Sequence, residues 1–436
     1  MRVLTRDWQD LPLGIKGRKI GEEYEFRAER PPASFAVSSL HESDGDTRAE
    51  VAVRSEEPGN EGYLLRDRLN LLSSRSKVEF SNRLLAKSSN APWIEIVEVI
   101  ALVSLETFRA GEPFLFLDEA PLDQDVGYLL DKLLPLGDAT VIYGDGMSGK
   151  SMTALLIGIG VSAGVGIPGF PYRQEGPGRV LYLDWEARAS THRRRLAALA
   201  QGLEVPEPKG MLRYRRMVRS LRDDLRVVKE DIDRFDIKAV VIDSMMPSCG
   251  GEPESAEVVS SFFNGLREMG DEVTKVVVSH ITKAEARQNG PARPFGSVMT
   301  TNLARSTWEL KRSSPEDGRY LEVGLFHTKV NDGMLCKPCS LRYDFAPGII
   351  KPSVANPEDN PEFLAHTSPA VQIRAVLKMG AKSLEEIIEE TGLSSGAIRT
   401  ALKYEMADVV QVTKGGGRGN KTTWGLTARG IEEINF

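Results

Sequence analysis

Residues 144–151 read Gly144-Asp145-Gly146-Met147-Ser148-Gly149-Lys150-Ser151, a glycine-rich segment that ends in lysine and serine. It matches the pattern G-x-x-x-x-G-K-[S/T] at every fixed position. Glycines let backbone N–H groups wrap around phosphate oxygens without clashes from Cβ atoms. Lys150 then places a positive charge on the β- and γ-phosphates, and the Ser151 hydroxyl is a ligand for Mg²⁺. The stretch therefore predicts a loop that binds ATP together with Mg²⁺.

Apolar strands alternate with amphipathic helices around this loop. The predicted strands lie at 140–144, 179–186, 238–245 and 275–281, and the predicted helices at 151–163, 191–201, 221–235 and 255–269. Strands that are apolar along their whole length are typical of a parallel sheet covered by helices on both faces. Two further runs, 320–330 and 340–345, are typical of a terminal β-hairpin pair. We therefore expect one α/β domain over residues 121–352.

Two of the predicted strands end in acidic residues. Val240-Val241-Ile242-Asp243 is an apolar run with an acidic tip, so Asp243 is the expected second protein ligand of Mg²⁺. The alternative is that Asp243 merely caps the next element. The run that begins at Leu181 ends in Asp184 and Glu186. An ionised carboxylate there can orient and deprotonate a water molecule that faces the γ-phosphate.

The order of these elements resembles that of the RecA-like hexameric ATPases, in particular the RepA/DnaB type of replicative helicase. The resemblance covers about residues 121–345. It implies a RecA-like P-loop NTPase core that assembles as a ring, which we expect to be a hexamer. It also implies that Glu186 polarises the attacking water. Asp184 is the rival for this role, and its alternative role is to cap the turn that follows.

The next strand and the loop after it extend the resemblance. The run 276–280 resembles the family's strand whose last residue senses the γ-phosphate, which gives His280 this role. The polar loop at 282–295 resembles the mobile loop that faces single-stranded DNA in the central pore. Its cations are Lys283, Arg287 and Arg293. The ordinary alternatives are a structural histidine and a solvated loop.

Two later segments predict contacts between neighbouring subunits. The segment 295–305 resembles the family's "G-S…R" segment and assigns an interface role to Arg305. The segment 326–331 resembles the "K-x-R/N" strand end, from which Lys329 would reach the neighbouring subunit's γ-phosphate and stabilise transition-state charge. Asn331 stands where DnaB-type helicases carry arginine, which favours the RepA-like branch or a weaker ATPase.

Three further segments flank the predicted ATPase domain. Residues 1–120 are expected to form a small α+β docking or oligomerisation domain, with helices near 67–87 and 92–109. Residues 353–368 are rich in proline, asparagine and acidic residues, which is typical of a linker. Residues 369–436 predict three helices and a β-wing, and so a winged helix-turn-helix.

DNA binding by the predicted winged domain would use its third helix and its glycine-rich wing. The candidate contacts are Arg399, Lys403, Lys414, Arg418 and Lys421. Many winged domains bind proteins instead, and the near-neutral charge of this segment leaves that alternative open.

Composition excludes several classes of protein. The chain of 436 residues has 56 Lys and Arg against 62 Asp and Glu, and its net charge is −6. A protein that is basic throughout is excluded, but a local basic site for DNA is not. No run of about 18 apolar residues occurs, so we expect neither a membrane protein nor a membrane partner. The three cysteines are too few for a disulfide framework, and we expect a reducing, cytoplasmic location.

Two other patterns carry alternatives. Cys336-Lys337-Pro338-Cys339 is a lone C-x-x-C pair, which we interpret as a hairpin loop because zinc would need two more ligands. The arginines at 193–195 and 213–219 would face phosphates or a neighbouring subunit, or would form a solvated face paired with acids. The second interpretation is favoured.

The sequence thus supports two hypotheses about function. The first is a ring-forming ATPase that acts on DNA as a helicase or translocase, in the replication or recombination of a mobile element or phage. Residues 1–120 would then dock a replication partner. The second is an ATP-gated DNA-binding regulator or loader that does not unwind DNA. A small-molecule kinase is disfavoured, because no site for an acceptor is recognisable.

Overall fold

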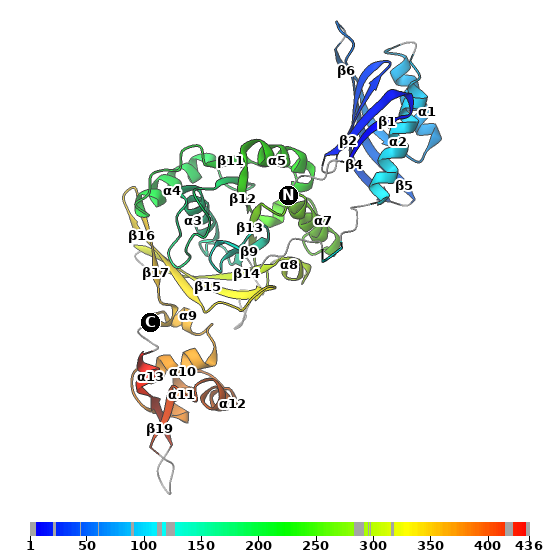
Figure 1. Cartoon of the computed structure of the whole chain (residues 1–436). Helices are drawn as coiled ribbons and strands as arrows, with labels where there is room; N and C mark the ends of the chain where they lie inside the picture. Colours follow the sequence, from blue (N-terminus) through cyan, green and yellow to red (C-terminus); the bar gives the residue numbers. More distant parts are fainter. Residues whose placement is uncertain are drawn as a thin grey trace. The chain divides into compact units, whose positions relative to one another are not determined.

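A computed structural model of the chain forms two compact units, Met1–Asp123 and Gln124–Phe436 (Figure 1). Each unit is considered by itself. The structure describes residues 6–20, 23–43, 45–59, 61–88, 91–110, 116–118, 127–282, 292–294, 296, 298–314, 318–414 and 422–432.

The first unit is built on a six-stranded sheet in which each strand pairs with the next along the chain. All of these pairings are antiparallel. The strands are β1 (Arg6–Leu11), β2 (Ile15–Ile20), β3 (Glu23–Glu29), β4 (Pro32–Ser43), β5 (Asp46–Ser55) and β6 (Gly62–Asn70). Alternate residues of β5 are buried, as is typical of a sheet with one covered face.

Two helices, α1 (Ser74–Leu85) and α2 (Trp93–Ala110), share a hydrophobic core with this sheet. The expected helix near 67–87 is wrong in its first part, because residues 67–70 belong to β6. The true start of α1 is set by Ser73, whose side chain accepts a hydrogen bond from the Ser76 N–H. The charged residues before Ser73 belong to strand β6 instead, and Arg66 of this strand forms an ion pair with Glu50 of β5.

The second unit contains a nine-stranded sheet in the order β11-β10-β12-β13-β9-β14-β15-β16-β17. The strands from β11 to β14 in this order run parallel, and β14 to β17 pair antiparallel. The strands are β9 (Ala139–Gly144), β10 (Arg179–Asp184), β11 (Leu212–Arg216), β12 (Ile237–Asp243), β13 (Thr274–His280), β14 (Ser306–Ser313), β15 (Tyr320–Val330), β16 (Cys339–Ala346) and β17 (Ile349–Ala355).

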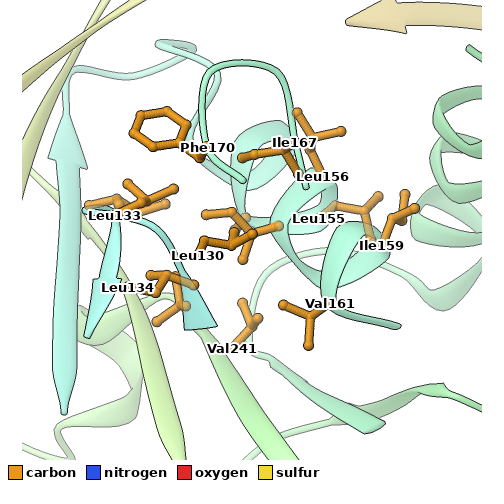
Figure 2. Close-up of a cluster of buried hydrophobic side chains, with 14 of the residues drawn as sticks. Leu130, Leu133, Leu134, Leu155, Leu156, Ile159, Val161, Ile167, Phe170 and Val241 are labelled. Carbon is orange, nitrogen blue, oxygen red and sulfur yellow. The ribbon is translucent and has the colours of Figure 1, made fainter. Parts of the chain in front are cut away.

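Helices cover both faces of this sheet. The predicted mixed α/β core with a mainly parallel sheet is confirmed. On one face, Ala239 and Val241 of β12 pack toward α3 (Lys150–Ala163), with α4 (Ala189–Gly202) beyond it. Figure 2 shows Val241 beside the leucines and isoleucines of α3 and the strand pair β7 (Tyr128–Leu130) and β8 (Leu134–Pro135). On the other face, Val240 and Ile242 pack toward α5 (Leu221–Phe235) and α7 (Ala256–Arg267). The remaining helices of the core are α6 (Met245–Ser248) and α8 (Val298–Leu303).

Sequence patterns did not predict β11, β14 or β17. Strand β11 reads LRYRR and lies at the edge of the sheet, so its arginines remain partly exposed and the strand lacks an apolar pattern. Strand β14 is the parallel neighbour of β9 and leads directly into the antiparallel part of the sheet.

The segment 353–368, expected to be a linker, is ordered. Its first residues belong to β17, and two short helices follow, η3 (Pro357–Asp359) and α9 (Pro361–Leu364). Phe363 is fully buried, and its ring lies against Phe326 and Gly324 of β15. Glu358 accepts hydrogen bonds from Arg374 and Lys378. These contacts attach the end of the chain to the sheet.

The last part of the chain consists of helices around a three-stranded sheet in the order β18-β20-β19. The elements are α10 (Pro369–Leu377), β18 (Lys382–Ser383), α11 (Leu384–Thr391), α12 (Ser395–Thr400) with the wider turn η4 (Ala401–Glu405), β19 (Val410–Lys414), β20 (Thr423–Leu426) and α13 (Ala428–Glu432). Ser383 and Glu386 form a capping box at the start of α11. Among the described helices of the whole chain, none has the length and apolar character needed to cross a membrane.

Candidate functional site

The loop 144–149 connects the end of β9 to the start of α3. Two of its glycines are required by the fold. A Cβ atom on Gly144 would lie 2.2 Å from the carbonyl oxygen of Leu310, and one on Gly149 would lie 2.7 Å from Cγ2 of Val323. Gly149 also has φ +85°, a left-handed conformation that side chains strain. The neighbouring strands β14 and β15 therefore force the chain to turn tightly here.

Gly146 differs from these two glycines. A Cβ atom there would meet nothing within 4 Å, so the fold itself does not demand a glycine. The neighbouring Asp145 accepts the Gly146 N–H through Oδ1 at 2.7 Å. Close approach of a phosphate to the backbone is the remaining physical reason for a residue without a side chain at this position.

The ammonium group of Lys150 lies inside the curve of this loop. Its Nζ donates to the carbonyl oxygens of Gly144 at 3.0 Å and Asp145 at 2.6 Å, and to Oγ of Ser148 at 3.3 Å. Burial lowers the pKa of Lys150 to about 8. The positive charge is thus held at the N-terminus of α3, whose dipole also favours an anion.

Asp243 meets the requirements of a Mg²⁺ ligand. Its Oδ2 accepts a hydrogen bond from the Tyr182 hydroxyl at 2.6 Å. Its Oδ1 is buried and has no partner among the described residues. Burial raises the pKa of Asp243, and hydrogen bonds from Tyr182 and Ser151 oppose this rise. A carboxylate oxygen that lacks a partner, next to the Ser151 hydroxyl, is a donor set that fits Mg²⁺.

Asp184 is fully buried and is occupied by the protein itself. Its Oδ1 accepts the backbone N–H groups of Glu186 at 2.9 Å and Ala187 at 3.0 Å. Its Oδ2 is 2.9 Å from Nε2 of His192 and 3.1 Å from the Tyr214 hydroxyl. Burial alone would raise the pKa of Asp184, but these hydrogen bonds, that of His192 foremost, hold it below its ordinary value. This is the capping arrangement that the sequence left open, and it leaves Asp184 no free oxygen for water.

Glu186 is the partly exposed carboxylate beyond that turn, and its side chain is 45% exposed. Its Oε1 accepts a hydrogen bond from the Ser244 hydroxyl and lies 3.5 Å from Nε2 of His280. The His280 imidazole, and to a lesser extent Ser244, hold the pKa of Glu186 below its ordinary value against the effect of burial. Glu186 is therefore ionised near neutral pH and can accept a proton from water.

The register of the parallel strands brings these groups to one edge of the sheet. Asp184 of β10 pairs with Asp243 of β12, and His280 of β13 pairs with Gly144 of β9. Since carboxyl ends of parallel strands lie at the same edge, the loop, Asp243 and Glu186 are gathered there.

The predicted interface residues lie at the opposite edge of the sheet, where the parallel strands begin. The Arg305 N–H donates to the Ala139 carbonyl at 3.1 Å, at the start of β9. The loop that binds phosphate begins at the other end of this six-residue strand, roughly 17 Å away at about 3.3 Å per residue. The Arg305 side chain is 3.7 Å from Asp138, and its carbonyl accepts the Asn331 N–H at 3.0 Å. Arg305 and Asn331 therefore lie far from the loop of their own chain.

Lys329 lies beside them and caps α8 of its own chain. Its Nζ donates to the carbonyl oxygens of Thr301, Asn302 and Ala304 at 2.6–2.9 Å. Burial, with the charge of Arg305, lowers the pKa of Lys329. These three hydrogen bonds would have to break before Lys329 could reach a phosphate on another subunit.

The predicted DNA contacts are only partly placed. Lys283, Arg287, Arg418 and Lys421 lie outside the described residues. Arg293 is exposed, Arg399 lies in the last turn of α12, and Nζ of Lys403 lies 4.8 Å from the centre of the Tyr404 ring. Lys414 is the last residue of β19.

The two other patterns have structural explanations. The Cys336 N–H donates to Nδ1 of His327 at 3.1 Å, and burial raises the pKa of Cys339 to about 12. No group of three metal-ligating side chains occurs in the described part of the chain. Within the arginine run, Arg193 pairs with Glu207 at 2.9 Å, and Arg215 and Arg219 pair with Asp231 and Asp224. These pairs are what the interpretation as a solvated face predicts.

Sequence reasoning missed several residues of the site. Ser244 directly follows Asp243, and this position next to a candidate site residue was the one signal by which the sequence could have identified it. Tyr182 and Tyr214 lie within strands and look like ordinary sheet residues, and His192 looks like an ordinary helix residue. Only the paired strands and the packing of α4 bring these three side chains together.

One comparison with known proteins covers the residues of this site. A family model described as an AAA domain matches residues 109–286, which include the loop, Glu186, Asp243 and His280. A solved KaiC-like protein from the hyperthermophilic archaeon Pyrococcus horikoshii is 18% identical, with a TM-score of 0.37 over 53% of this chain and 97% of that one. No curated protein matches the chain. The phosphate-binding loop and the match to an AAA domain together indicate a P-loop domain that binds ATP.

Proposed function

We propose that the protein is a ring-forming motor, with six subunits, that couples ATP hydrolysis to movement on DNA as a helicase or translocase. The contact between His280 and Glu186 carries this proposal. His280 ends β13, and the cations at 283 and 287 follow it directly. A change at the γ-phosphate would therefore pass through one histidine to a segment with the charge to bind a DNA backbone.

The proposed hydrolysis uses the groups at the carboxyl edge of the sheet. Glu186 orients a water molecule and accepts its proton while the water oxygen attacks the γ-phosphorus. The bond to the bridging oxygen breaks, and ADP keeps that electron pair. Lys150 stabilises the charge on the transferred phosphate. Mg²⁺, held by Ser151 and Asp243, supplies further neutralisation of the phosphate charge when it is bound.

The ring is the part of the proposal that gives the opposite edge a role. Arg305, Lys329 and Asn331 are gathered there, too far from their own loop to act on it. In a ring, this edge would face the nucleotide of the neighbouring subunit. A cation arriving from there would tie hydrolysis to the subunit interface.

The terminal parts of the chain are proposed to supply further contacts. We assign 369–436 as a winged helix-turn-helix that touches DNA through α12 and the wing between β19 and β20. The sheet and helices of the first unit would dock a replication partner. Two exposed apolar side chains on α1, Val78 and Leu85, suit such a contact.

The test is ATP hydrolysis with and without single-stranded DNA, on the wild type and on Glu186→Gln. The motor is expected to be stimulated by DNA, and Glu186→Gln is expected to bind ATP but to hydrolyse it at least about 100-fold more slowly. Tyr172→Phe is a matched control, because the Tyr172 hydroxyl donates to the Gly176 carbonyl, away from the site. Full hydrolysis by Glu186→Gln would contradict the role of this carboxylate.

A second function is favoured by the contacts of Lys329. Since its three hydrogen bonds lie within its own chain, hydrolysis in trans would be weak, as suits an ATP-gated DNA-binding regulator or loader. A strand-displacement assay separates the two functions. Binding to one duplex site, with ATPase activity indifferent to single strands and no displacement, would favour the regulator.

A further inference from the structure

We propose that Asp184 and His192 form a positioning pair that fixes Glu186 for attack on the γ-phosphate. Neither residue would touch the nucleotide. The inference rests on the proposed role of Glu186 and adds the residues through which that role is maintained. The sequence offered Asp184 only as a rival base or as a simple cap.

The first step of the argument is the turn at the end of β10. Asp184 accepts the N–H groups of Glu186 and Ala187 on a single oxygen. The backbone of the catalytic carboxylate is thus tied to a side chain that is itself fully buried. A carboxylate accepts such bonds strongly only while it is ionised. The groups that keep Asp184 ionised and fixed in place therefore determine the position of Glu186.

The second step is what holds Asp184. His192, 5% exposed on α4, donates from Nε2 to Oδ2 of Asp184 at 2.9 Å, because an ionised carboxylate can only accept. The Tyr214 hydroxyl lies 3.1 Å from the same oxygen and 3.1 Å from the Ala187 carbonyl. Burial and the Asp184 charge raise the pKa of Tyr214 to about 12, so it stays a donor. Helix α4 and edge strand β11 therefore both support the turn.

The third step links this pair to the metal ligand. The imidazole of His192 lies between two rings, with its centre 4.7 Å from that of Tyr182 and 5.6 Å from that of Tyr214. Tyr182 in turn donates to Oδ2 of Asp243 and leaves Oδ1 free. The buried imidazole of His192 thus lies beside both tyrosines, Tyr182 that donates to Asp243 and Tyr214 that donates to Asp184.

A structural role alone does not account for this arrangement well. Nδ1 of His192 is buried, and no described group accepts from it or donates to it. A leucine would fill such a position without leaving a polar atom unpaired, which costs about 1–3 kcal/mol. What histidine adds is a rigid donor aimed at Asp184. Positioning errors of about 1 Å cost roughly 100-fold in rate, which is reason enough to keep it.

The experiment compares His192→Phe, which keeps an aromatic ring without a donor, with His192→Gln, which keeps a donor in place of Nε2. Steady-state kcat and KM for ATP are measured, together with the stoichiometry and Kd of a fluorescent ATP analogue. For His192→Phe we expect kcat to fall about tenfold to 100-fold. KM, Kd and stoichiometry should stay within about twofold, because the P-loop is intact. His192→Gln should recover most of kcat.

Two further variants keep the result decisive. If His192→Phe does not fold, Tyr214→Phe removes a single hydroxyl and should lower kcat in the same manner, while Tyr172→Phe should not. The double variant of His192→Phe with Glu186→Gln should be no slower than Glu186→Gln alone, because His192 acts through Glu186.

Three outcomes would overturn the inference, and each differs from the others. An unchanged kcat in His192→Phe, while Glu186→Gln is inactive, rejects the positioning pair but keeps the proposed base. A fall of kcat in step with nucleotide stoichiometry, so that the rate per bound nucleotide is unchanged, rejects the positioning pair, because the whole effect is then a loss of folded protein. Full activity of Glu186→Gln removes the base itself, and the positioning pair with it.

Discussion

Nε2 of His280 lies 3.5 Å from Oε1 of Glu186, although His280 ends β13, Glu186 follows β10, and β12 lies between these two strands in the sheet. The contact is made across the end of β12, and Ser244, which directly follows that strand, donates to the same oxygen. Glu186 is therefore oriented by the two strands that follow β10 in the sheet. Any change in these strand ends alters the carboxylate that is proposed to activate water.

The acid limb of the pH profile should depend on His280. His280 is the main cause of the lowered pKa of Glu186, and Glu186 must be ionised to accept a proton. Activity is therefore lost as the pH falls through the pKa of Glu186 in the folded protein. In His280→Leu this pKa rises, so the acid limb of single-turnover kcat should move to higher pH. His41→Gln, which alters an exposed histidine of the first unit, should leave the limb in place.

Lys150 should take up a proton when ATP binds. Its pKa of about 8 means that about half of the free protein lacks this charge at pH 8, and phosphate oxygens favour the charged form. Calorimetry in buffers of different ionisation enthalpy should give an uptake of about 0.5 proton at pH 8 and almost none at pH 6.5. Lys150→Arg should show no uptake if it binds at all, since arginine stays protonated. Uptake that persists in this variant would assign the proton to another group.

Two glycine substitutions should separate fold from ligand binding. Gly149→Ala places a Cβ atom 2.7 Å from Val323 at φ +85°, and should cost about 1–3 kcal/mol of stability as well as nucleotide binding. Gly146→Ala meets nothing within 4 Å and should keep the wild-type Tm while it weakens ATP binding. Thermal melts with and without nucleotide test both. A loss of Tm in Gly146→Ala without nucleotide would contradict the distinction.

Asp243→Asn should remove the dependence of nucleotide affinity on Mg²⁺. The wild type is expected to bind ATP at least about tenfold more tightly with Mg²⁺ than with EDTA, because Oδ1 of Asp243 is free to bind the ion. The variant should bind ATP in EDTA as the wild type does and gain nothing from Mg²⁺. Asp131→Asn, which breaks a surface ion pair with Arg173, is the matched control.

Phe363→Ala should destabilise the second unit by about 3–5 kcal/mol, the usual cost of truncating a fully buried aromatic ring. Limited proteolysis should then cut between 356 and 368, where the wild type resists. Phe345→Ala, which truncates a phenylalanine that is 42% exposed, should have a much smaller effect. Equal proteolysis of wild type and Phe363→Ala would mean that the short helices are not held by this ring.

The core of the fold followed from the sequence because two independent patterns agree. The phosphate-binding pattern requires a strand before it and a helix after it, and fully apolar strands separated by helices predict a parallel sheet. The edge strands carry no such pattern. Strand β11 consists of one leucine, three arginines and a tyrosine. Arg215 pairs with Asp231 and Tyr214 with Asp184, 16 and 30 residues away along the chain. Its existence depends on tertiary contacts that no local pattern encodes.

The site divides in a similar way. Lys150, Ser151 and Asp243 stand at positions that chemistry prescribes, so spacing was enough to nominate them. The preference for Glu186 over Asp184 depends on which carboxylate is already hydrogen-bonded within the protein. His192 and Tyr214, the partners of Asp184, lie eight and thirty residues beyond it. Likewise, the pattern that predicted a contact of Lys329 with the neighbouring subunit's γ-phosphate contains no information about the carbonyl oxygens at the end of α8, to which Lys329 donates.

Strand β15 has consequences for how such a chain can acquire a different terminal module. Val323 faces the phosphate-binding loop at Gly149, and its neighbour Gly324 faces Phe363 on the opposite side of the strand. A single inserted residue would exchange these two faces, so the strand tolerates no shift of register. A recombination joint at residue 352 would also separate the ATPase domain from Phe363, whose ring packs against Gly324. Exchange of the terminal module by gene fusion is therefore easiest beyond Thr367, with α9 inherited alongside the ATPase domain.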